Sequence, residues 1–330
     1  MMRQLGWGIM ATGGIAGQFA RDLALDGHRL AAVGSRDPAK ARQFADQFGA
    51  GRAHGSYEDL VADPDVDVVY VATPHSHHLA GALAAIGAGK HVLVEKPLTI
   101  NAREARALAA AAAQAGVVAM EAMWTRFLPH MAKLRQWIAD GRLGDLEGLV
   151  VDHTQALPED PRHRINDPAL GGGALLDLGV YPISFAYDLF GPPARVEVKS
   201  ASLGPAGTDR SVAGELTYPG GARALWVTAS DTRGPNVATV LGSRAQANLA
   251  SVWYTATELR LVSTDGRELE AFDGAVPGRG MQFQAREVER LVAGGLLTSE
   301  IMPLAESIEI MATMDQIRAE IGVVYPADAA

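Results

Sequence analysis

A lysine in the turn Glu95-Lys96-Pro97 is the side chain whose type and position most directly suggest chemistry. The turn follows the apolar run His91–Val94, so it stands at the carboxyl end of an expected buried strand, where open α/β sheets bind ligands. Pro97 biases Lys96 toward an extended backbone and fixes its direction. A lysine held there can donate a hydrogen bond to a substrate oxygen and stabilise developing negative charge. The alternative is an ordinary strand-end lysine that extends into solvent.

A second pattern, Ala11-Thr12-Gly13-Gly14-Ile15-Ala16, separates an expected strand from an expected helix. It reads A-x-G-x-x-A, a variant of the G-x-G-x-x-G/A dinucleotide fingerprint. Gly13 would let the backbone approach a pyrophosphate, and the helix N-terminus would offer N–H groups and a positive dipole end. Because Ala11 replaces the first glycine, we expect a turn built without positive φ there. Such turns also serve plain chain reversal, but this position favours a cofactor.

The residues at the end of the second expected strand bear on which dinucleotide binds. An Asp or Glu about 20 residues beyond the turn accepts a bond from the ribose 2′-OH, whereas an Arg accommodates a 2′-phosphate. Here the chain has Ser35 and Arg36, and Asp37 comes one place too late to be the simple ribose acceptor. Ser35 and Arg36 therefore favour NADP, the alternative being that Arg36 is a solvated loop charge.

The elements that must position these residues alternate in the first third of the chain. Short apolar runs predict strands over Leu5–Met10, Arg29–Gly34, Val68–Ala72, His91–Val94 and Val117–Met120. Helical patterns lie between them, over Ile15–Leu25, Ala39–Phe48, Leu79–Ala88 and Arg103–Ala115. Strands alternating with helices predict parallel βαβ units, and nearly continuous apolar strands indicate a sheet covered on both faces.

The pattern changes after about residue 123, where segments alternate apolar with polar residues and are joined by Gly or Asp turns. These segments predict an antiparallel sheet from Leu146–His153, Arg195–Ser202, Ala213–Tyr218, Ala222–Thr228, Ala238–Gly242, Gln246–Leu249 and Glu258–Val262. Helices are expected over Pro129–Asp140, Gly173–Phe190, Met281–Ala293 and Leu304–Ile321. We therefore expect an α/β domain over 1–122 and an α+β domain over 123–330.

The composition of the 330 residues excludes several classes of function. Lys and Arg total 29 against 38 Asp and Glu, a net charge of −9, which argues against a nucleic-acid partner. The chain has no Cys, so a disulfide scaffold, a Cys-based zinc site and a cysteine nucleophile are excluded. No apolar run reaches the ~18 residues of a membrane span, and the first residues lack the pattern of a signal peptide. We expect a cytoplasmic protein with no membrane partner.

Four motifs in order resemble the glucose–fructose oxidoreductase / inositol dehydrogenase (Gfo/Idh/MocA) family. They are the Gly-rich turn, Thr73-Pro74-x-x-x-His78, Glu95-Lys96-Pro97, and the run Gly171-Gly172-Gly173-Ala174-Leu175-Leu176-Asp177-Leu178-Gly179-Val180-Tyr181. The run Glu121-Ala122-Met123-Trp124-Thr125-Arg126-Phe127 and the Tyr181 variant look most like the branch of dimeric dihydrodiol and NADP-dependent D-xylose dehydrogenases. The resemblance covers nearly the whole chain. It implies an N-terminal Rossmann doubly wound parallel sheet, then an α+β domain with a large open, mainly antiparallel sheet.

The resemblance also implies catalytic roles. Lys96 matches the family's catalytic lysine, and Asp177 and Tyr181 match its acid followed four residues later by His or Tyr. Residues four apart on a helix are neighbours, so both can face one pocket. Tyr181 would accept the hydroxyl proton, with the Lys96 ammonium favouring its phenolate, and Asp177 could orient the substrate or Lys96. Without the family, a helix-stabilising charge and a core aromatic would be the simpler interpretation.

Further site residues follow from the same motifs. His75 stands where the family often has Asn, near the cofactor ribose, and its role is open, while His78 is expected to cap or pack beside the nicotinamide. The expected cofactor-binding residues are Ala11, Thr12, Gly13, Gly14, Ile15, Ser35, Arg36, Thr73, Pro74, His75, His78, Glu95, Lys96, Trp124 and Arg126. Trp124 and Trp253 are expected to join Lys96, Asp177 and Tyr181 against substrate, with core packing as the alternative. No metal is expected, because nothing completes a site for His75, His77 and His78.

These features together favour an NAD(P)-dependent oxidoreductase, with NADP preferred, acting on a carbinol carbon of a sugar, polyol or trans-diol. Two alternatives remain from the same family: a glycosidase with tightly bound NAD, and a non-catalytic sugar sensor that binds a dinucleotide. Retention of Lys96, Asp177 and Tyr181 argues against the sensor. An open sheet exposes a broad face that usually finds a partner, so a homodimer or homotetramer is expected.

Overall fold

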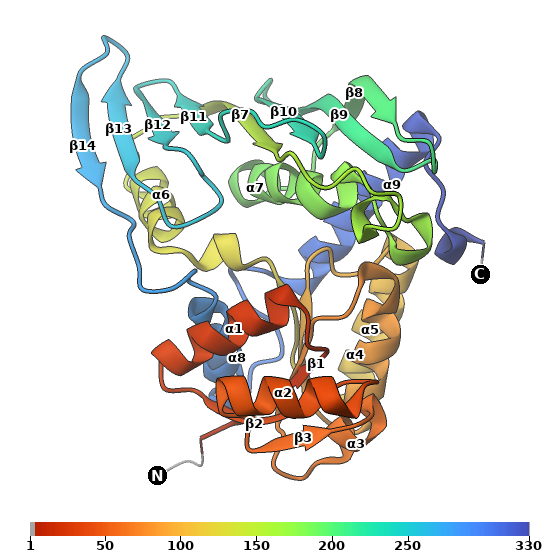
Figure 1. Ribbon diagram of the computed structural model, residues 1–330. Helices are drawn as coiled ribbons and strands as arrows, with labels where there is room; N and C mark the ends of the chain where they lie inside the picture. Colours follow the sequence, from red (N-terminus) through yellow and green to blue (C-terminus); the bar gives the residue numbers. More distant parts are fainter. Residues whose placement is uncertain (1–3, 330) are drawn as a thin grey trace. The chain divides into compact units, whose positions relative to one another are not determined.

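Residues 4–329 are described by the structure, a computed structural model, and they form two compact units (Figure 1). The first unit contains residues 4–124 and 277–308, and the second contains 125–276 and 309–329. The sequence predicts a single boundary after residue 122. The compact units differ from that division because a later segment returns to pack with the first unit.

The first unit is built on a six-stranded parallel sheet in the order β3-β2-β1-β4-β5-β6. Its strands are β1 (Gly6–Met10), β2 (Arg29–Gly34), β3 (Arg52–His54), β4 (Val68–Val71), β5 (His91–Glu95) and β6 (Ala119–Ala122). The connecting helices are α1 (Gly14–Leu25), α2 (Pro38–Phe48), α3 (Tyr57–Ala62), α4 (His78–Gly87) and α5 (Ala102–Ala115). Helix α1 packs with α2, and α4 packs with α3 and α5 (Figure 1). The predicted Rossmann doubly wound sheet is confirmed.

The strands form where continuous apolar runs can be covered on both faces. Every residue of β1 and of β4 is buried, as a central parallel strand requires. Strand β3 and helix α3 were not predicted from the sequence. Strand β3 is only three residues long and its side chains are partly or fully exposed, so it has no apolar run to mark it.

Two carboxylates join the returning segment to the rest of the first unit: Asp22 of α1, which is buried, and Glu289 of the returning segment, whose side chain is 26% exposed. The Asp22 carboxylate accepts the backbone N–H groups of Arg279, at 3.0 Å, and of Met281, at 2.9 Å. Helix α8 (Gln282–Ala293) follows, and its Glu289 accepts the Trp7 indole N–H at 2.9 Å and lies 2.8 Å from His28 Nδ1. These polar contacts satisfy groups of α1, β1 and the α1–β2 turn, so the first unit is complete only with this segment.

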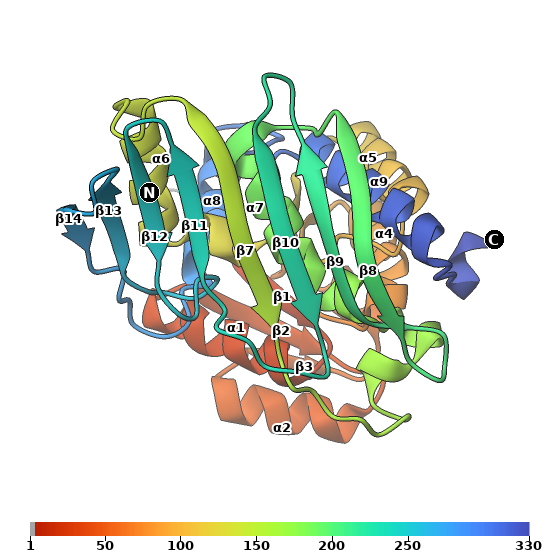
Figure 2. The same ribbon diagram turned by 90° about the horizontal axis from the view of Figure 1, so that it is seen from above.

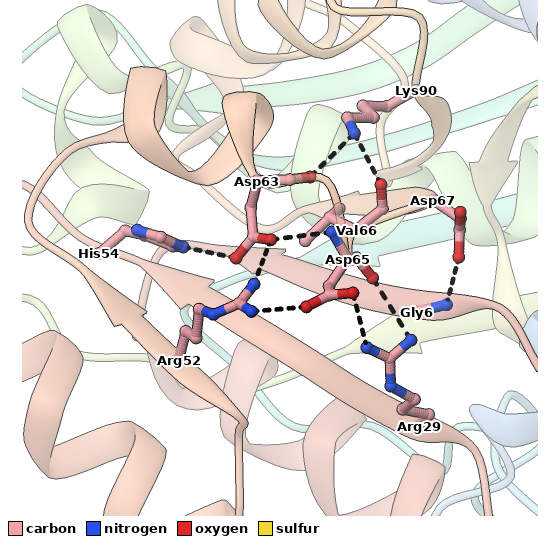
Figure 3. Close-up of polar contacts among 9 residues, drawn as sticks. All are labelled: Gly6, Arg29, Arg52, His54, Asp63, Asp65, Val66, Asp67 and Lys90. Carbon is pink, nitrogen blue, oxygen red and sulfur yellow. Dashed lines mark hydrogen bonds and ion pairs between the residues drawn. The ribbon is translucent and has the colours of Figure 1, made fainter.

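A polar network centred on Asp63 joins β3 to the loop that leads into β4 (Figure 3). The Asp63 carboxylate accepts hydrogen bonds from Arg52, at 2.6 Å, and from the Asp65 backbone N–H, at 2.9 Å, and lies 2.8 Å from His54 Nε2. The Lys90 ammonium donates to the carbonyl oxygens of Asp63, at 2.9 Å, and Val66, at 2.7 Å. The network fixes the end of the sheet where its strands begin.

The second unit holds an eight-stranded sheet in the order β14-β13-β12-β11-β7-β10-β9-β8. Its strands are β7 (Leu146–Thr154), β8 (Arg195–Leu203), β9 (Asp209–Thr217), β10 (Arg223–Ala229), β11 (Ala238–Gly242), β12 (Ala245–Leu249), β13 (Leu259–Ser263) and β14 (Glu268–Phe272). All neighbouring pairs are antiparallel except β7 with β10, which confirms the predicted mainly antiparallel sheet. Strand β14, an edge strand with little burial, was not predicted from the sequence.

The two faces of this sheet differ. Helices α6 (Pro129–Ala139) and α7 (Val180–Phe190) lie on one side of the sheet (Figure 1). Trp226 and Thr228, which alternate with exposed residues along β10, are buried. Among the described residues of the second unit, no helix covers the opposite face (Figure 2). That face carries exposed apolar side chains on three adjacent central strands: Val150 (48%), Leu225 (46%), Val227 (44%) and Leu241 (37%).

Within residues 4–329, one helical segment, Pro168–Phe190, is long and apolar enough to cross a membrane by length and composition alone. In its most apolar window, 89% is buried. It is therefore a core helix of the second unit.

Candidate active site

The Gly-rich turn lies between β1 and α1, as predicted, but its backbone differs from the prediction at one residue. Ala11 has φ of 92°, so the expectation of a turn without positive φ there was wrong. The Ala11 N–H donates to the Gly34 carbonyl at 2.9 Å, which ties the turn to the end of β2. The tight turn of the fingerprint is thus made with an alanine in a conformation that normally selects glycine.

The start of α1 is open to an anion. A Cβ added at Gly13 or at Gly14 would meet no other atom within 4 Å, so the packing of the protein does not require glycine there. Gly13 caps α1 with no side-chain hydrogen bond, and the first turn of the helix has no acidic residue. N–H groups at a helix start with the positive end of its dipole suit a pyrophosphate. The site therefore fits a dinucleotide.

Two residues follow β2: Arg36, whose side chain is exposed, and Asp37, whose carboxylate is engaged in capping α2. The Asp37 carboxylate caps α2 by accepting the N–H groups of Ala39, at 2.9 Å, and Lys40, at 3.3 Å. Arg36 is exposed and lies beside the Tyr57 hydroxyl, where burial raises the pKa of Tyr57 against the opposing effect of the Arg36 charge. An exposed guanidinium next to a carboxylate that is already engaged fits a 2′-phosphate better than a free ribose hydroxyl.

The loop after β4 places Thr73, Pro74 and His75 at the carboxyl end of the sheet. The Thr73 hydroxyl is buried and has no hydrogen-bond partner among the described residues. A buried hydroxyl of this kind fits a ligand that supplies the partner. The His75 ring is buried and lies edge-on to His78, with ring centroids 5.6 Å apart.

His78 connects this loop to the lysine turn. Its Nδ1 is 2.9 Å from the Pro97 carbonyl oxygen, and its Nε2 is 3.0 Å from that of Thr73. Burial lowers the pKa of His78 to about 3, so the ring is neutral and donates its one N–H to one of these carbonyls. The His78 side chain is fully buried. It therefore joins the loop after β4 to the lysine turn from inside the first unit and does not face solvent.

Lys96 follows β5 in a turn that is braced by two buried carboxylates. Glu95 accepts a hydrogen bond from the Tyr70 hydroxyl and from the Lys96 N–H, the latter at 3.2 Å. Burial raises the pKa of Glu95 against the opposing effect of Lys96. Glu121 accepts the Leu98 N–H at 3.0 Å, and the Lys96–Pro97 peptide is cis. The bracing leaves Lys96, which is half-buried, at the carboxyl edge of the sheet.

Trp124 lies at the end of the first unit with a cation over its ring. Its indole is buried, and the Arg279 guanidinium carbon is 4.8 Å from the ring centroid. The charge of Arg279 also lowers the pKa of Glu95, in opposition to burial. Arg279 was not predicted as a site residue, because it reaches this site only through the return of its segment to the first unit.

Asp177 and Tyr181 lie in the second unit on one continuous helical segment. Asp177 is inside a π-helical turn, Leu175–Gly179, and Tyr181 is in the first turn of α7. Single π-helical turns are frequent at functional sites. Both side chains are buried, and the Arg164 guanidinium donates to the Asp177 carboxylate at 3.0 Å. Arg164 was not predicted as a site residue, because no motif marks it.

An aromatic cluster surrounds Tyr181. His153, on β7, lies edge-on to Tyr181 with centroids 4.7 Å apart, and it stacks on Tyr254 at 3.8 Å. Tyr254 in turn lies 5.5 Å from Tyr181. His153 and Tyr254 were not predicted, since they are far from Tyr181 along the chain and only the tertiary fold brings them together.

Arg126 and Trp253, two predicted site residues, support this helix and cluster from behind. The Arg126 guanidinium donates to the Ser184 hydroxyl at 2.9 Å and to its carbonyl at 2.5 Å, which holds α7 one turn beyond Tyr181. Trp253 is fully buried, stacks on Phe185 and donates its indole N–H to the Asp152 carbonyl at 2.7 Å. Tyr254 is therefore a better candidate than Trp253 for contact with a substrate.

The parallel sheet, the anion-ready turn and the braced lysine define a dinucleotide-dependent oxidoreductase. Residues 5–123 match the oxidoreductase family with an NAD-binding Rossmann fold, and residues 131–248 match the GFO/IDH/MocA C-terminal domain. The chain belongs to the GFO/IDH/MocA family, which confirms the resemblance found in the sequence. It is thus an NAD(P)-dependent oxidoreductase.

Relatives of known activity match along almost the full chain. Trans-1,2-dihydrobenzene-1,2-diol dehydrogenase from Bos taurus is 35% identical, with 98% of this chain and 99% of the relative covered. D-xylose 1-dehydrogenase (NADP(+)) from Hypocrea jecorina is 35% identical, with 98% and 93% covered. Among solved structures, the aldose-aldose oxidoreductase from Caulobacter crescentus, complexed with glycerol, has a TM-score of 0.87 and 27% identity, with 97% and 98% covered.

Proposed function

We propose that this protein is an NADP-preferring dehydrogenase that oxidises a carbinol carbon of a sugar, a polyol or a cyclic trans-diol. The observation that carries the proposal is the placement of Tyr181 within an aromatic cluster, one helical turn after Asp177 with its Arg164 partner. The braced Lys96 on the first unit supports it. Relatives named as diol and D-xylose dehydrogenases, each 35% identical, support the substrate class.

The proposed chemistry divides among three side chains. Lys96 donates a hydrogen bond to the substrate oxygen and, as a cation, favours the phenolate of Tyr181. Tyr181 accepts the hydroxyl proton and passes it to solvent, while Asp177 orients the substrate hydroxyl or the Lys96 ammonium. The bound nicotinamide supplies the acceptor for the hydride from the carbinol carbon. In the reverse direction, Tyr181 returns the proton to the carbonyl oxygen.

The proposed cofactor is NADP, with NAD as the weaker substitute. Arg36 is exposed at the end of β2. The adjacent Asp37 carboxylate caps α2, so it is not available to accept a hydrogen bond from the ribose hydroxyls of NAD. We assign the pyrophosphate to the turn at Gly13 and Gly14, and the ribose and nicotinamide side to Thr73 and its neighbours in the loop. The NADP-dependent D-xylose dehydrogenase among the relatives supports this preference.

The substrate is expected to present an apolar face to the rings of the site. Sugars and cyclic diols have C–H surfaces that pack on aromatic faces, while their hydroxyls need the polar groups of Lys96 and Asp177. His153 and Tyr254 beside Tyr181 supply rings in the second unit, and Trp124 supplies one in the first.

We also propose a homodimer or homotetramer in the cytoplasm, assembled through the open face of the eight-stranded sheet. Val150 pairs with Leu225 across β7 and β10, so the exposed apolar side chains form one continuous patch rather than scattered residues. Contiguous apolar patches of this kind mark association sites, and a second copy of the chain offers a matching face. Sedimentation as a monomer at working concentration contradicts the proposal.

A cofactor-reduction assay tests the proposed function. The protein is mixed with NADP or NAD and a panel of aldoses, inositols and trans-cyclic diols, and reduced nicotinamide is followed by absorbance. Turnover with NADP and one class of substrate supports the proposal. A Lys96→Ala variant is expected to lose turnover while its affinity for the cofactor, measured by fluorescence, is retained.

Other outcomes of the assay favour the alternatives. A purified protein that carries NAD and hydrolyses a glycoside without net reduction is a glycosidase. A protein that binds a dinucleotide but turns over no substrate with either cofactor, in both directions, is a sensor. Unchanged turnover in Lys96→Ala removes the assigned role of Lys96.

A further inference from the structure

The helical segment that carries Asp177 and Tyr181 begins in an unusually close backbone contact. Gly173, just before it, has φ of 119°. A Cβ added there would lie 2.3 Å from Asp209 Oδ1 and 3.0 Å from the Tyr325 hydroxyl oxygen. The chain therefore needs glycine at this position, because two side chains from distant segments are pressed against the backbone.

Asp209, the first residue of β9, caps the segment from a neighbouring strand. Its carboxylate is buried and accepts the Leu175 N–H at 2.6 Å. Leu175 is two residues before Asp177, so this bond fixes the turn that holds the acid. A helix start leaves its N–H groups without intrahelical partners, and an acceptor from another strand both satisfies one and anchors the end.

Tyr325 holds the backbone on the preceding side. Its buried hydroxyl donates a hydrogen bond to the Gly172 carbonyl. The Tyr325 ring is itself held in place, because the Arg318 guanidinium carbon lies 4.9 Å from its centroid. The same guanidinium forms an ion pair with the Asp328 carboxylate at 2.7 Å. Asp328 also accepts the Tyr325 N–H at 2.8 Å. Tyr325, Arg318 and Asp328, which lie outside the aromatic cluster, thus fix the backbone at the start of the helical segment.

We propose that Asp209 and Tyr325 are positioning residues, which fix the start of this helical segment and so set the places of Asp177 and Tyr181. The inference rests on the proposed function, because its effect on turnover passes through those two side chains. A helix transmits a shift at its first turn along its axis, and a misplacement of about 1 Å can lower a rate by about 10²-fold. Loss of either anchor should therefore lower kcat more than it raises KM.

Tyr325→Phe tests the inference with Tyr187→Phe as the matched control. Tyr187 lies on the same helix but toward its other end, where its hydroxyl bonds the Thr313 hydroxyl at 2.8 Å and the Glu309 carbonyl at 3.2 Å. Both variants delete one buried hydroxyl, so similar shifts of the thermal midpoint are expected. We expect kcat of Tyr325→Phe to fall at least about 10-fold with KM changed less than about 3-fold, and kcat of Tyr187→Phe to stay near wild type.

Conservative replacement at Asp209 gives a second readout. Asn keeps an oxygen that can accept the Leu175 N–H, whereas Ala does not. Burial raises the pKa of Asp209 to about 6, so the site penalises the charge of this carboxyl relative to water. We expect Asp209→Ala to lose kcat as Tyr325→Phe does, and Asp209→Asn to recover most of it.

Three results overturn the inference, two of them alone and one together with the proposed function. Normal wild-type turnover with equal kcat in Tyr325→Phe and Tyr187→Phe, or equal losses in Asp209→Asn and Asp209→Ala, overturns it alone. A wild-type protein that turns over no member of the substrate panel overturns the proposed function and this inference together.

Discussion

The Arg164 guanidinium lies 3.0 Å from the Asp177 carboxylate, and the two side chains differ sharply in exposure. The Asp177 side chain is buried, with 4% of its surface exposed, whereas the Arg164 side chain is 46% exposed. A charge-assisted hydrogen bond from a rim arginine to a buried acid fixes the orientation of the carboxylate. The pair therefore acts on the geometry of the acid more than on the stability of the unit.

Replacement of Arg164 by Ala is expected to lower kcat/KM by about 10- to 100-fold, because this is the factor that corresponds to the loss of a hydrogen bond to a charged group. The thermal midpoint should change little, because a half-exposed ion pair contributes only about 0–1 kcal/mol. Arg162→Ala is the control, since Arg162 is 90% exposed in the same loop and pairs only with Asp160 among the described residues. Steady-state kinetics with the identified substrate makes the comparison, and equal effects of the two variants contradict the assigned role.

Arg36→Ala tests the cofactor preference. Removal of a guanidinium from a 2′-phosphate should weaken NADP binding by about 10- to 100-fold while NAD binding stays within about 2-fold. Arg42→Ala, an exposed arginine on the adjacent α2, is the control for a general loss of positive charge. Titration of intrinsic fluorescence with each dinucleotide measures both constants. An equal loss for NAD and NADP would show that Arg36 does not contact the 2′ position.

Ala11→Gly tests the positive φ in the Gly-rich turn. An alanine in this region is strained by about 1–2 kcal/mol, and glycine removes the strain but adds freedom to the unfolded chain. We expect the free energy of unfolding to rise by about 0.5–1 kcal/mol. Ala16→Gly, inside α1, should instead lose at least about 1 kcal/mol. Urea denaturation compares the two, and a loss of stability in Ala11→Gly would contradict the strained conformation.

The loss of folding stability at acid pH should depend on Asp63. Burial by itself raises the pKa of Asp63, but hydrogen bonds from the Asp65 N–H, His54 and Arg52 outweigh it, so the folded-state pKa lies below the ordinary value of 3.8. A depressed pKa contributes stability that is present above the unfolded value and is lost as pH falls through the folded value. Asp63→Asn should therefore be less stable than wild type near pH 7, with the gap closing below about pH 4.

Denaturation curves at several pH values measure this gap, and Asp46→Asn, at an exposed position of α2, is the control. The control should show no such closing gap. If Asp63→Asn keeps the same deficit at pH 3 as at pH 7, the network in Figure 3 does not hold an ionised Asp63.

The parallel domain could be predicted because its signals are local. Buried strands such as β1 and β4 are apolar at nearly every position, and turns such as Gly116 mark the helix ends. The lysine turn and the acid–tyrosine spacing are also local motifs. Strand β3 escaped prediction because three partly exposed residues carry no periodic signal.

What the sequence could not show depends on contacts between distant segments. His153 and Tyr254 surround Tyr181 only because the sheet brings their strands and loops together. Asp22 has no motif, yet it accepts two N–H groups from the returning segment. The φ of Ala11 was mispredicted because residue type gives only a preference, which the hydrogen bond to Gly34 overrides.

The return of residues 277–308 to the first unit has a consequence for the order of synthesis. A growing chain usually folds its N-terminal domain as soon as the ribosome releases it. Here the Trp7 indole lacks its acceptor Glu289, and the buried Asp22 carboxylate lacks the N–H groups of Arg279 and Met281, until those residues have been translated. The nascent first unit must therefore wait through most of translation with these groups exposed, and a fragment that ends at residue 124 would keep that exposure permanently.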